Sequence, residues 1–122
     1  MAKTSTIAPP NALIFISDAS GGEAPEFVAN MPVLSTDAAI SVSCLPNMDG
    51  ETHIILGNAD EVGFPEAPIF DGILKTPTNV VVVSTVEHDS ILEATVPLRE
   101  TRVRVWTNRA LDPDEIAIAL GG

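Results

Sequence analysis

Cysteine and long apolar runs are nearly absent from this chain of 122 residues. Its single thiol, Cys44, cannot form an internal disulfide, so a disulfide framework is excluded. The residue stands in an alternating run with Ile40 and Val42, which predicts a small buried side chain. No apolar stretch approaches the roughly 20 residues of a spanning helix, and residues 1–10 lack the apolar segment of a signal peptide. We therefore expect a cytoplasmic protein that has no membrane partner.

Basic residues are also scarce. There are 6 Lys and Arg against 17 Asp and Glu, and the formal net charge is −11 at pH 7. An acidic chain repels phosphate backbones and gains little from counterion release, so nucleic-acid binding is disfavoured. The partner that this charge favours is a basic protein. Four of the basic residues nevertheless fall within eleven positions: Arg99, Arg102, Arg104 and Arg109.

Recognisable catalytic motifs are missing as well. His88 and Asp89, with Ser84 or Ser90, supply the residue types of a nucleophilic triad, but no Gly-x-Ser-x-Gly elbow frames them. A solvated turn is the favoured interpretation of this segment. The glycine pair at 21–22 lacks the pattern of a phosphate-binding loop. These absences favour a protein without enzymatic activity and without a cofactor.

One group of residues has the chemistry of a divalent-metal site. Asp49, Glu51 and His53 alternate along the chain, so an extended strand would present all three side chains on one face. A structural metal usually needs four ligands, and no second cluster supplies the remainder. The favoured interpretation is the polar outer face of a hairpin, and a metal site at these three residues is the alternative.

What the chain does contain is a succession of short β-branched segments. The clearest four span 69–76, 79–86, 90–98 and 101–107. Each is rich in Val, Ile and Thr, and turn residues separate it from the next. This pattern predicts consecutive antiparallel strands.

Weaker signals occupy the rest of the chain. We expect a strand at 12–16, a hairpin over 38–56, and a long loop at 57–68 that is a candidate for binding or for protection of a sheet edge. The tail, 113–120, is predicted to form a turn and a last strand, with a short helix as the alternative. Residues 1–10 end in two prolines and are expected to form a flexible leader.

Together these segments predict an all-β fold. The expected architecture is an antiparallel β-sandwich of about seven or eight short strands, and a small closed barrel is the alternative. Residues 11–122 have the length of a single domain.

The last of the four clear strands carries the most informative side chains. It alternates strictly, with Val103 and Val105 on one face and Arg102, Arg104 and Trp106 on the other. Arg and Trp are enriched in binding hot spots, so this face is a candidate partner-binding surface or homodimer seam. The other interpretation is that Trp106 closes one end of the core while the arginines pair with carboxylates on a neighbouring strand, such as Glu93.

The C-terminal half also resembles a known family. It has the segment 69–77, then an apolar strand, then Val96-Pro97-Leu98 leading into the Arg-Val-Arg-Val-Trp strand at 102–106. This layout resembles small bacterial all-β proteins related to competence protein J. That family is associated with inhibition of a nuclease, so the resemblance implies an all-β fold and an inhibitor-like role.

The function that the sequence favours is therefore a non-catalytic protein-interaction module. An acidic inhibitor or immunity-type partner of a basic protein is the specific form that we expect. The alternatives are a small metal-dependent enzyme that uses Asp49, Glu51 and His53, and a subunit that assembles with copies of itself, for example as a homodimer.

Overall fold

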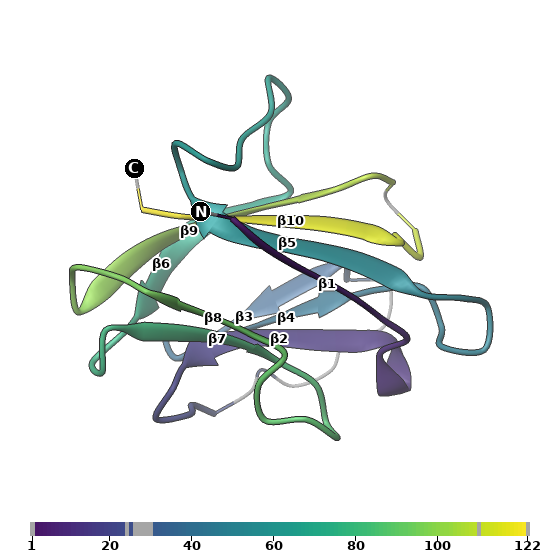
Figure 1. The fold of residues 1–122 in the computed structure, drawn as a ribbon, viewed down its shortest axis with the longest axis horizontal. Helices are drawn as coiled ribbons and strands as arrows, with labels where there is room; N and C mark the ends of the chain where they lie inside the picture. Colours follow the sequence, from purple (N-terminus) through teal and green to yellow (C-terminus); the bar gives the residue numbers. More distant parts are fainter. Residues whose placement is uncertain (1, 24, 26–30, 110, 122) are drawn as a thin grey trace.

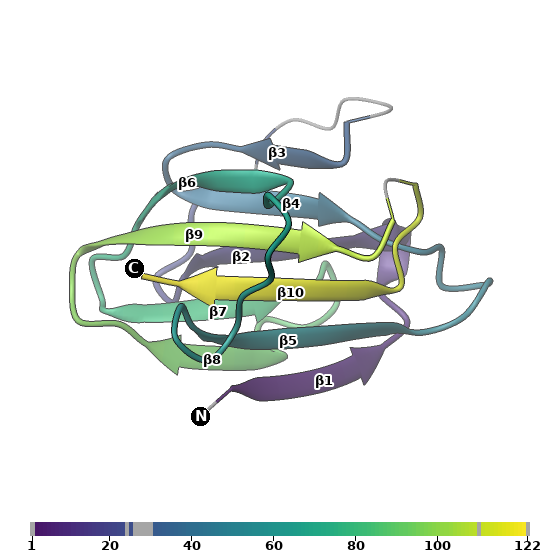
Figure 2. The same cartoon turned by 90° about the horizontal axis from the view of Figure 1, so that it is seen from above.

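The structure, a computed structural model, describes residues 2–23, 25, 31–109 and 111–121. In this part of the chain, ten strands form two five-stranded sheets that pack face to face (Figure 1, Figure 2). Sheet A contains, in spatial order, β1 (Lys3–Ile7), β5 (Thr52–Asn58), β10 (Glu115–Leu120), β9 (Glu100–Thr107) and β6 (Phe70–Lys75). Sheet B contains β3 (Val33–Ser35), β4 (Ala39–Ser43), β2 (Leu13–Asp18), β7 (Val80–Ser84) and β8 (Leu92–Thr95). The predicted all-β sandwich is confirmed, with more strands than expected.

Alternating apolar residues from both sheets form the core between them. Val103 and Val105 of β9 are fully buried there, which confirms the predicted inward face of that strand. Cys44 is buried in the same core, as predicted. Burying an aliphatic side chain stabilises a fold by roughly 1.5–3 kcal/mol. The largest fully buried side chains are Ile14, Ile16, Ile40, Ile54, Leu56, Leu74, Ile116 and Ile118.

Two predicted strand pairings are wrong. The hairpin over 38–56 does not form, because β4 pairs with β2 and β3 in sheet B whereas β5 pairs with β1 and β10 in sheet A. Of the four consecutive segments in 69–107, β7 and β8 pair with each other within sheet B, but β6 pairs with β9 in sheet A and not with β7. Strands that follow one another usually pair, and a period-two pattern cannot reveal where the chain crosses to the other sheet.

Within the expected flexible leader, residues 1–10, the segment 3–7 forms strand β1. β1 pairs antiparallel with β5, from Lys3 opposite Leu56 to Ile7 opposite Thr52. A single 3-10 turn, η1 (Pro10–Ala12), then leads into β2. The sequence of β1, Lys-Thr-Ser-Thr-Ile, has no apolar alternation, and most of its side chains are exposed. The strand is held in place by its backbone pairing with β5.

The tail forms strand β10, as predicted. It pairs antiparallel with β9 and in parallel with β5, which makes it the exception among otherwise antiparallel pairings of described strands. This places β10 in the middle of sheet A. None of the helical structure in the described ranges is long and apolar enough to cross a membrane.

Candidate functional site

The outer face of sheet A carries the predicted Arg102, Arg104 and Trp106. Across the β9–β10 pair, Trp106 lies opposite Ala117 and Arg104 lies opposite Ala119. Trp106 packs with these two alanines and with Val62 in a second apolar cluster, separate from the core. Only 8% of Trp106 is exposed. The indole therefore belongs to the outer face of the sheet and not to the end of the core.

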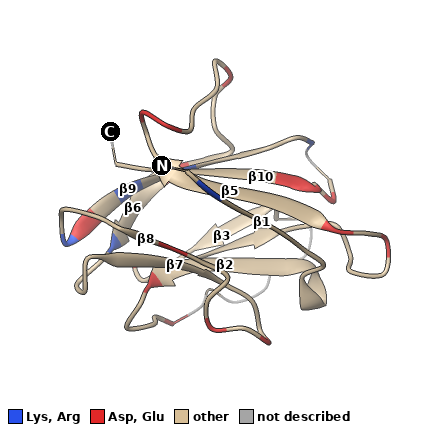
Figure 3. Cartoon of the chain, viewed as in Figure 1, with Lys and Arg blue, Asp and Glu red and all other residues tan. Residues whose placement is uncertain are grey.

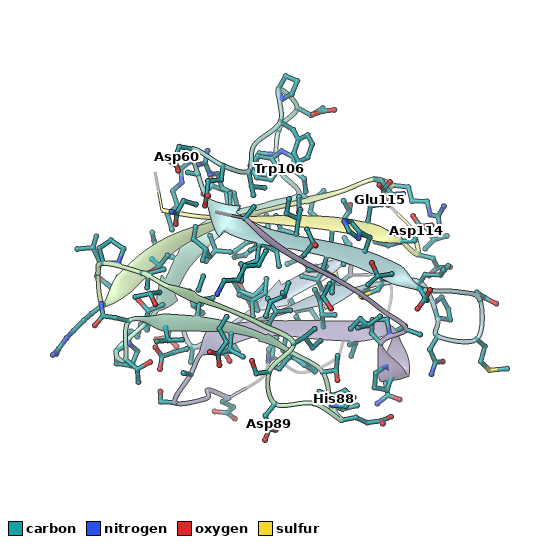
Figure 4. The ribbon with its side chains drawn as sticks, viewed as in Figure 1. Asp60, His88, Asp89, Trp106, Asp114 and Glu115 are labelled. Atoms are coloured by element: carbon teal, nitrogen blue, oxygen red, sulfur yellow. The ribbon has the colours of Figure 1, made fainter. Side chains whose placement is uncertain are left out.

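A long loop, residues 59–69, covers Trp106. This loop joins β5 to β6 and rises above sheet A, with Trp106 at its base (Figure 1, Figure 4). The indole Nε1–H donates a hydrogen bond of 2.9 Å to the backbone carbonyl of Glu66. The ring of Phe64 meets the indole edge to face, at a centroid distance of 5.6 Å and an interplanar angle of 62°. The loop predicted as a binding candidate thus supplies two contacts to the predicted tryptophan.

Both ends of this loop are fixed to sheet A. The backbone N–H of Ala59 donates to the carbonyl of Leu120 at 2.9 Å, and that of Ile69 donates to Val105 at 2.8 Å. Near its start, the Asn58 N–H donates to the Glu61 carboxylate at 3.0 Å. The loop is therefore held at its start, at its end and, through Trp106, in its middle.

Between this loop and the sheet lies a pocket of about 440 Å³. Trp106 and Phe64 supply aromatic walls, and Ile55 and Ala117 supply apolar surface from β5 and β10. The remaining lining residues are His53, Glu66, Ala67, Ile69, Thr107, Asn108, Glu115 and Ile116. Polar groups thus share the pocket with the aromatic pair.

The polar edge of the pocket is acidic. The backbone of Glu66 and Glu115 is engaged, by Trp106 and by the Asn108 side-chain oxygen respectively. Within the described residues, neither carboxylate has a hydrogen-bond or ion-pair partner. Asn108 also donates to the Asp114 carboxylate at 2.7 Å. Figure 3 shows acidic residues on the loop above sheet A and at the start of β10, close to the labelled Asp114 and Glu115 of Figure 4.

Arg102 forms an ion pair within the fold. Its guanidinium donates to both carboxylate oxygens of Asp71 on β6, at 2.9 Å from Nε and 2.6 Å from Nη2. These hydrogen bonds raise the pKa of Arg102 and lower that of Asp71. The expected pairing of an arginine with a neighbouring carboxylate occurs, but its partner is not Glu93, which lies on β8 in the other sheet.

Arg104 stands between this ion pair and the indole. Its guanidinium carbon lies 5.8 Å from the ring centre of Trp106, within the range of a cation–π contact. Its charge also helps to lower the pKa of Asp71, after the stronger effect of Arg102. The buried Arg104 Nε has no hydrogen-bond partner within the described part of the chain.

The structure does not bring the predicted metal ligands together. Asp49 lies in a turn that its N–H closes on the Pro46 carbonyl, and Glu51 is exposed ahead of β5. His53 lies on the outer face of sheet A, where Nδ1 is 2.9 Å from the Thr6 hydroxyl. Across the described ranges, no three His, Cys, Asp or Glu side chains are arranged to hold a metal ion. A metal at these residues stays a sequence-based prediction.

The residues of the triad pattern lie far from this pocket. His88 and Asp89 are exposed in the turn between β7 and β8, on the opposite side of the molecule from Trp106 (Figure 4). The Thr85 hydroxyl accepts hydrogen bonds from the backbone N–H groups of Glu87 and His88, which shapes that turn.

Sequence reasoning missed most of the residues that surround Trp106. Phe64 and Glu66 lie in the predicted loop, but the contact with Trp106 spans 40 positions. Glu115 reaches the pocket only because β10 enters the middle of sheet A beside β5. The one available signal was an aromatic residue, Phe64, between Gly63 and Pro65 in a loop.

Comparison with known proteins identifies the fold. The chain matches no known family profile and no curated protein. Its two-sheet architecture is shared by solved structures of low sequence identity. One is the crystal structure of ComJ, inhibitor of the DNA degrading activity of NucA, from Bacillus subtilis. It has a TM-score of 0.71 and 12% identity, and the match covers 98% of this chain and 95% of ComJ.

A second match is the structure described as crocagin biosynthetic gene J. It has a TM-score of 0.52 and 14% identity, and the match covers 99% of this chain and 97% of the other. At such identities the likeness concerns the fold. The resemblance to proteins related to competence protein J is confirmed at that level, and it extends beyond the C-terminal half to nearly the whole chain.

Proposed function

We propose that this chain is a non-catalytic protein-binding module that inhibits a basic protein, namely a DNA-degrading nuclease. The observation that carries the proposal is the fold match to ComJ, an inhibitor of the DNA degrading activity of NucA, over 98% of the chain. The match extends over nearly all of both sheets, so the whole molecule can be compared with that inhibitor.

The charge of the chain supports a partner of this kind. A nuclease must bind the phosphate backbone of DNA, and surfaces that do so are rich in Lys and Arg. A protein with a net charge of −11 is attracted to such a surface and can compete with DNA for it. The attraction acts over roughly 8–10 Å at moderate ionic strength, so added salt weakens it.

The proposed contact surface is the outer face of sheet A near β6 and β9. Arg104 and the Arg102–Asp71 ion pair lie on this face, and Trp106 lies beneath the loop beside them. Large apolar side chains are exposed around them: Phe64 at 51%, Ile69 at 43% and Ile73 at 56%. An exposed aromatic ring and exposed aliphatic side chains beside Arg are typical of the centre of a protein interface.

A DNA-degradation assay tests the proposal. Purified chain is titrated into a panel of DNA-degrading nucleases that includes NucA, with ComJ on NucA as the positive control. We expect stoichiometric inhibition of at least one nuclease, weaker at higher salt. If no nuclease is inhibited under conditions in which ComJ inhibits NucA, the proposal fails.

A matched pair of variants tests the contact surface. Ile73→Lys places a like charge on the proposed interface with a basic partner, whereas Val86→Lys adds the same charge to a residue of similar exposure, 54%, after β7. Both side chains are largely exposed to solvent, so both variants should fold. We expect Ile73→Lys alone to weaken inhibition. Equal inhibition by the two variants would show that the contact lies on another surface of the molecule.

Self-association is a second candidate, favoured by one observation. β6 is an edge strand of sheet A among the described strands, and it exposes Ile73 with Ile69 just before it. Exposed edges and apolar side chains are sites where two copies can pair. Sedimentation of the wild type and of Ile73→Lys tests this idea. A wild type that remains monomeric at the highest concentration used would exclude it.

A further inference from the structure

We propose that the pocket beside Trp106 receives a lysine or arginine side chain of the basic partner. This inference rests on the proposed function and deepens it, because it names the chemistry by which the partner is recognised. It is carried by three properties of the pocket: its size, its aromatic walls and the charge of its edge.

The size is sufficient for one long side chain. A volume of about 440 Å³ lies near the lower end of the range for small-molecule sites, roughly 300–1,000 Å³. The loop that forms one wall is fixed to sheet A through Ala59, Ile69 and Trp106. A pocket held in this way needs little ordering when a side chain enters, and that lowers the cost of binding.

The walls favour a cation. Trp and Phe rings attract a cation over their faces, and Trp does so most strongly. Trp106 and Phe64 both line the pocket and are held at a fixed angle to one another. Arg104 also contacts the indole, but it is not among the residues that line the pocket. The guanidinium of Arg104 therefore approaches Trp106 from outside the pocket.

The edge of the pocket has the complementary charge. Glu66 and Glu115 line it from the loop and from β10, and their carboxylates lack partners among the described residues. No lysine or arginine belongs to the described lining. Two unpaired carboxylates beside an aromatic wall attract a cationic side chain and repel a phosphate or a carboxylate.

The surroundings favour a side chain that belongs to a protein. The pocket opens beside the exposed Phe64 and Ile69, which form part of the proposed contact surface. A partner that buries this apolar surface would bring its own basic side chains to the pocket. A free amine would leave the same apolar side chains exposed.

The single tryptophan of the chain provides the measurement. Because Trp106 is the only Trp and there is no Tyr, intrinsic fluorescence reports directly on the pocket wall. The probes are N-acetyl-arginine methylamide and its uncharged analogue of the same shape, N-acetyl-citrulline methylamide. We expect a saturable fluorescence change with the arginine probe at roughly millimolar concentration and none with the citrulline probe.

Charge-removal variants localise the binding. Glu66→Gln/Glu115→Gln should weaken binding of the arginine probe about tenfold, while Glu87→Gln, an exposed site in the β7–β8 turn, should leave it unchanged. Equal responses to the two probes would overturn the proposal, and so would equal affinities of the double variant and the wild type. A loss of the same size in Glu87→Gln would show attraction by net charge alone and would also overturn it.

The nuclease assay separates this inference from the proposed function. If the chain inhibits a nuclease and Glu66→Gln/Glu115→Gln inhibits it equally well, the function holds and the pocket inference fails. If the arginine probe binds but no nuclease is inhibited, the chemistry of the pocket holds and the proposed function fails. Probe binding together with weaker inhibition by the double variant supports both.

Discussion

Asp18→Asn should destabilise the protein far more than the same exchange at an exposed aspartate. Asp18 lies at the end of β2 and is only 2% exposed. Its carboxylate accepts four hydrogen bonds: from the Ser20 N–H at 2.8 Å, the Ser20 hydroxyl at 2.6 Å, the Thr78 N–H at 3.0 Å and the Thr78 hydroxyl at 2.8 Å. This cluster ties the end of β2 to the turn between β6 and β7.

The size of the effect follows from the hydrogen bonds that asparagine cannot accept. Ser20 donates to one carboxylate oxygen and Thr78 to the other, so the amide nitrogen of an asparagine in this place would face two donors. Hydrogen bonds to charged groups contribute about 1.5–3 kcal/mol each, with losses that are not additive. We expect the free energy of unfolding to fall by about 3 kcal/mol, or a Tm lower by about 10 °C.

The effect should depend on pH in a defined direction. Burial of Asp18 opposes ionisation, but the hydrogen bonds from Ser20 and Thr78 outweigh it and lower the pKa. A carboxyl group with a lowered folded-state pKa stabilises the fold fully above its unfolded pKa, and this stabilisation is lost as the pH falls toward the folded pKa. The difference in the free energy of unfolding between wild type and variant should therefore begin to narrow at about pH 4.

Urea denaturation followed by circular dichroism measures both effects. Asp60→Asn, an exposed loop residue, is the matched control and should unfold like the wild type. If Asp18→Asn is as stable as Asp60→Asn at neutral pH, the hydrogen-bonded carboxylate does not stabilise the fold. If the difference in the free energy of unfolding between wild type and variant stays constant on acidification, the ionised Asp18 carboxylate is not the source of that difference.

Three further predictions concern single residues. Burial raises the pKa of the Cys44 thiol to about 12, so a thiol reagent should modify it only after unfolding; fast reaction in native protein would contradict this. Gly57→Ala would place a Cβ 3.0 Å from Val62, and should lower the free energy of unfolding by about 1–3 kcal/mol, whereas Gly63→Ala, with a nearest contact of 3.7 Å, should have little effect. Arg102→Gln removes a half-exposed ion pair, so Tm should fall only slightly, and a difference that persists at high salt would count against this reasoning.

The sequence was most informative about which side chains face the core. The strict alternation of 101–107 placed Val103 and Val105 inward, and both are fully buried. The same period placed Arg104 and Trp106 together on the outer face, where they are in contact. Burial of alternate residues is a local property of an extended chain, and it can therefore be read without knowledge of the partner strand.

Strand pairing was less predictable, because it depends on residues far apart in the chain. β5 has β1 and β10 as neighbours, which lie about fifty positions before it and sixty after it in the sequence. The polar β1 also shows no apolar pattern, since its backbone and not its side chains provides the pairing. The pocket depends on these same long-range pairings, so Glu115 and Glu66 could not be assigned to one site from the sequence.

The segment 116–120 shows how sheet A can carry a pocket on its outer face. Its residues, Ile-Ala-Ile-Ala-Leu, alternate in size and not in polarity, and all five are buried. The large side chains enter the core, while Ala117 and Ala119 face the loop and leave room for Trp106 and Val62. Alternation of large and small residues thus indicates a strand covered on both faces by layers of different thickness. The loop above β10 therefore packs on the outer face of sheet A through Val62 and Trp106, and the pocket between loop and sheet exists in the chain without a partner.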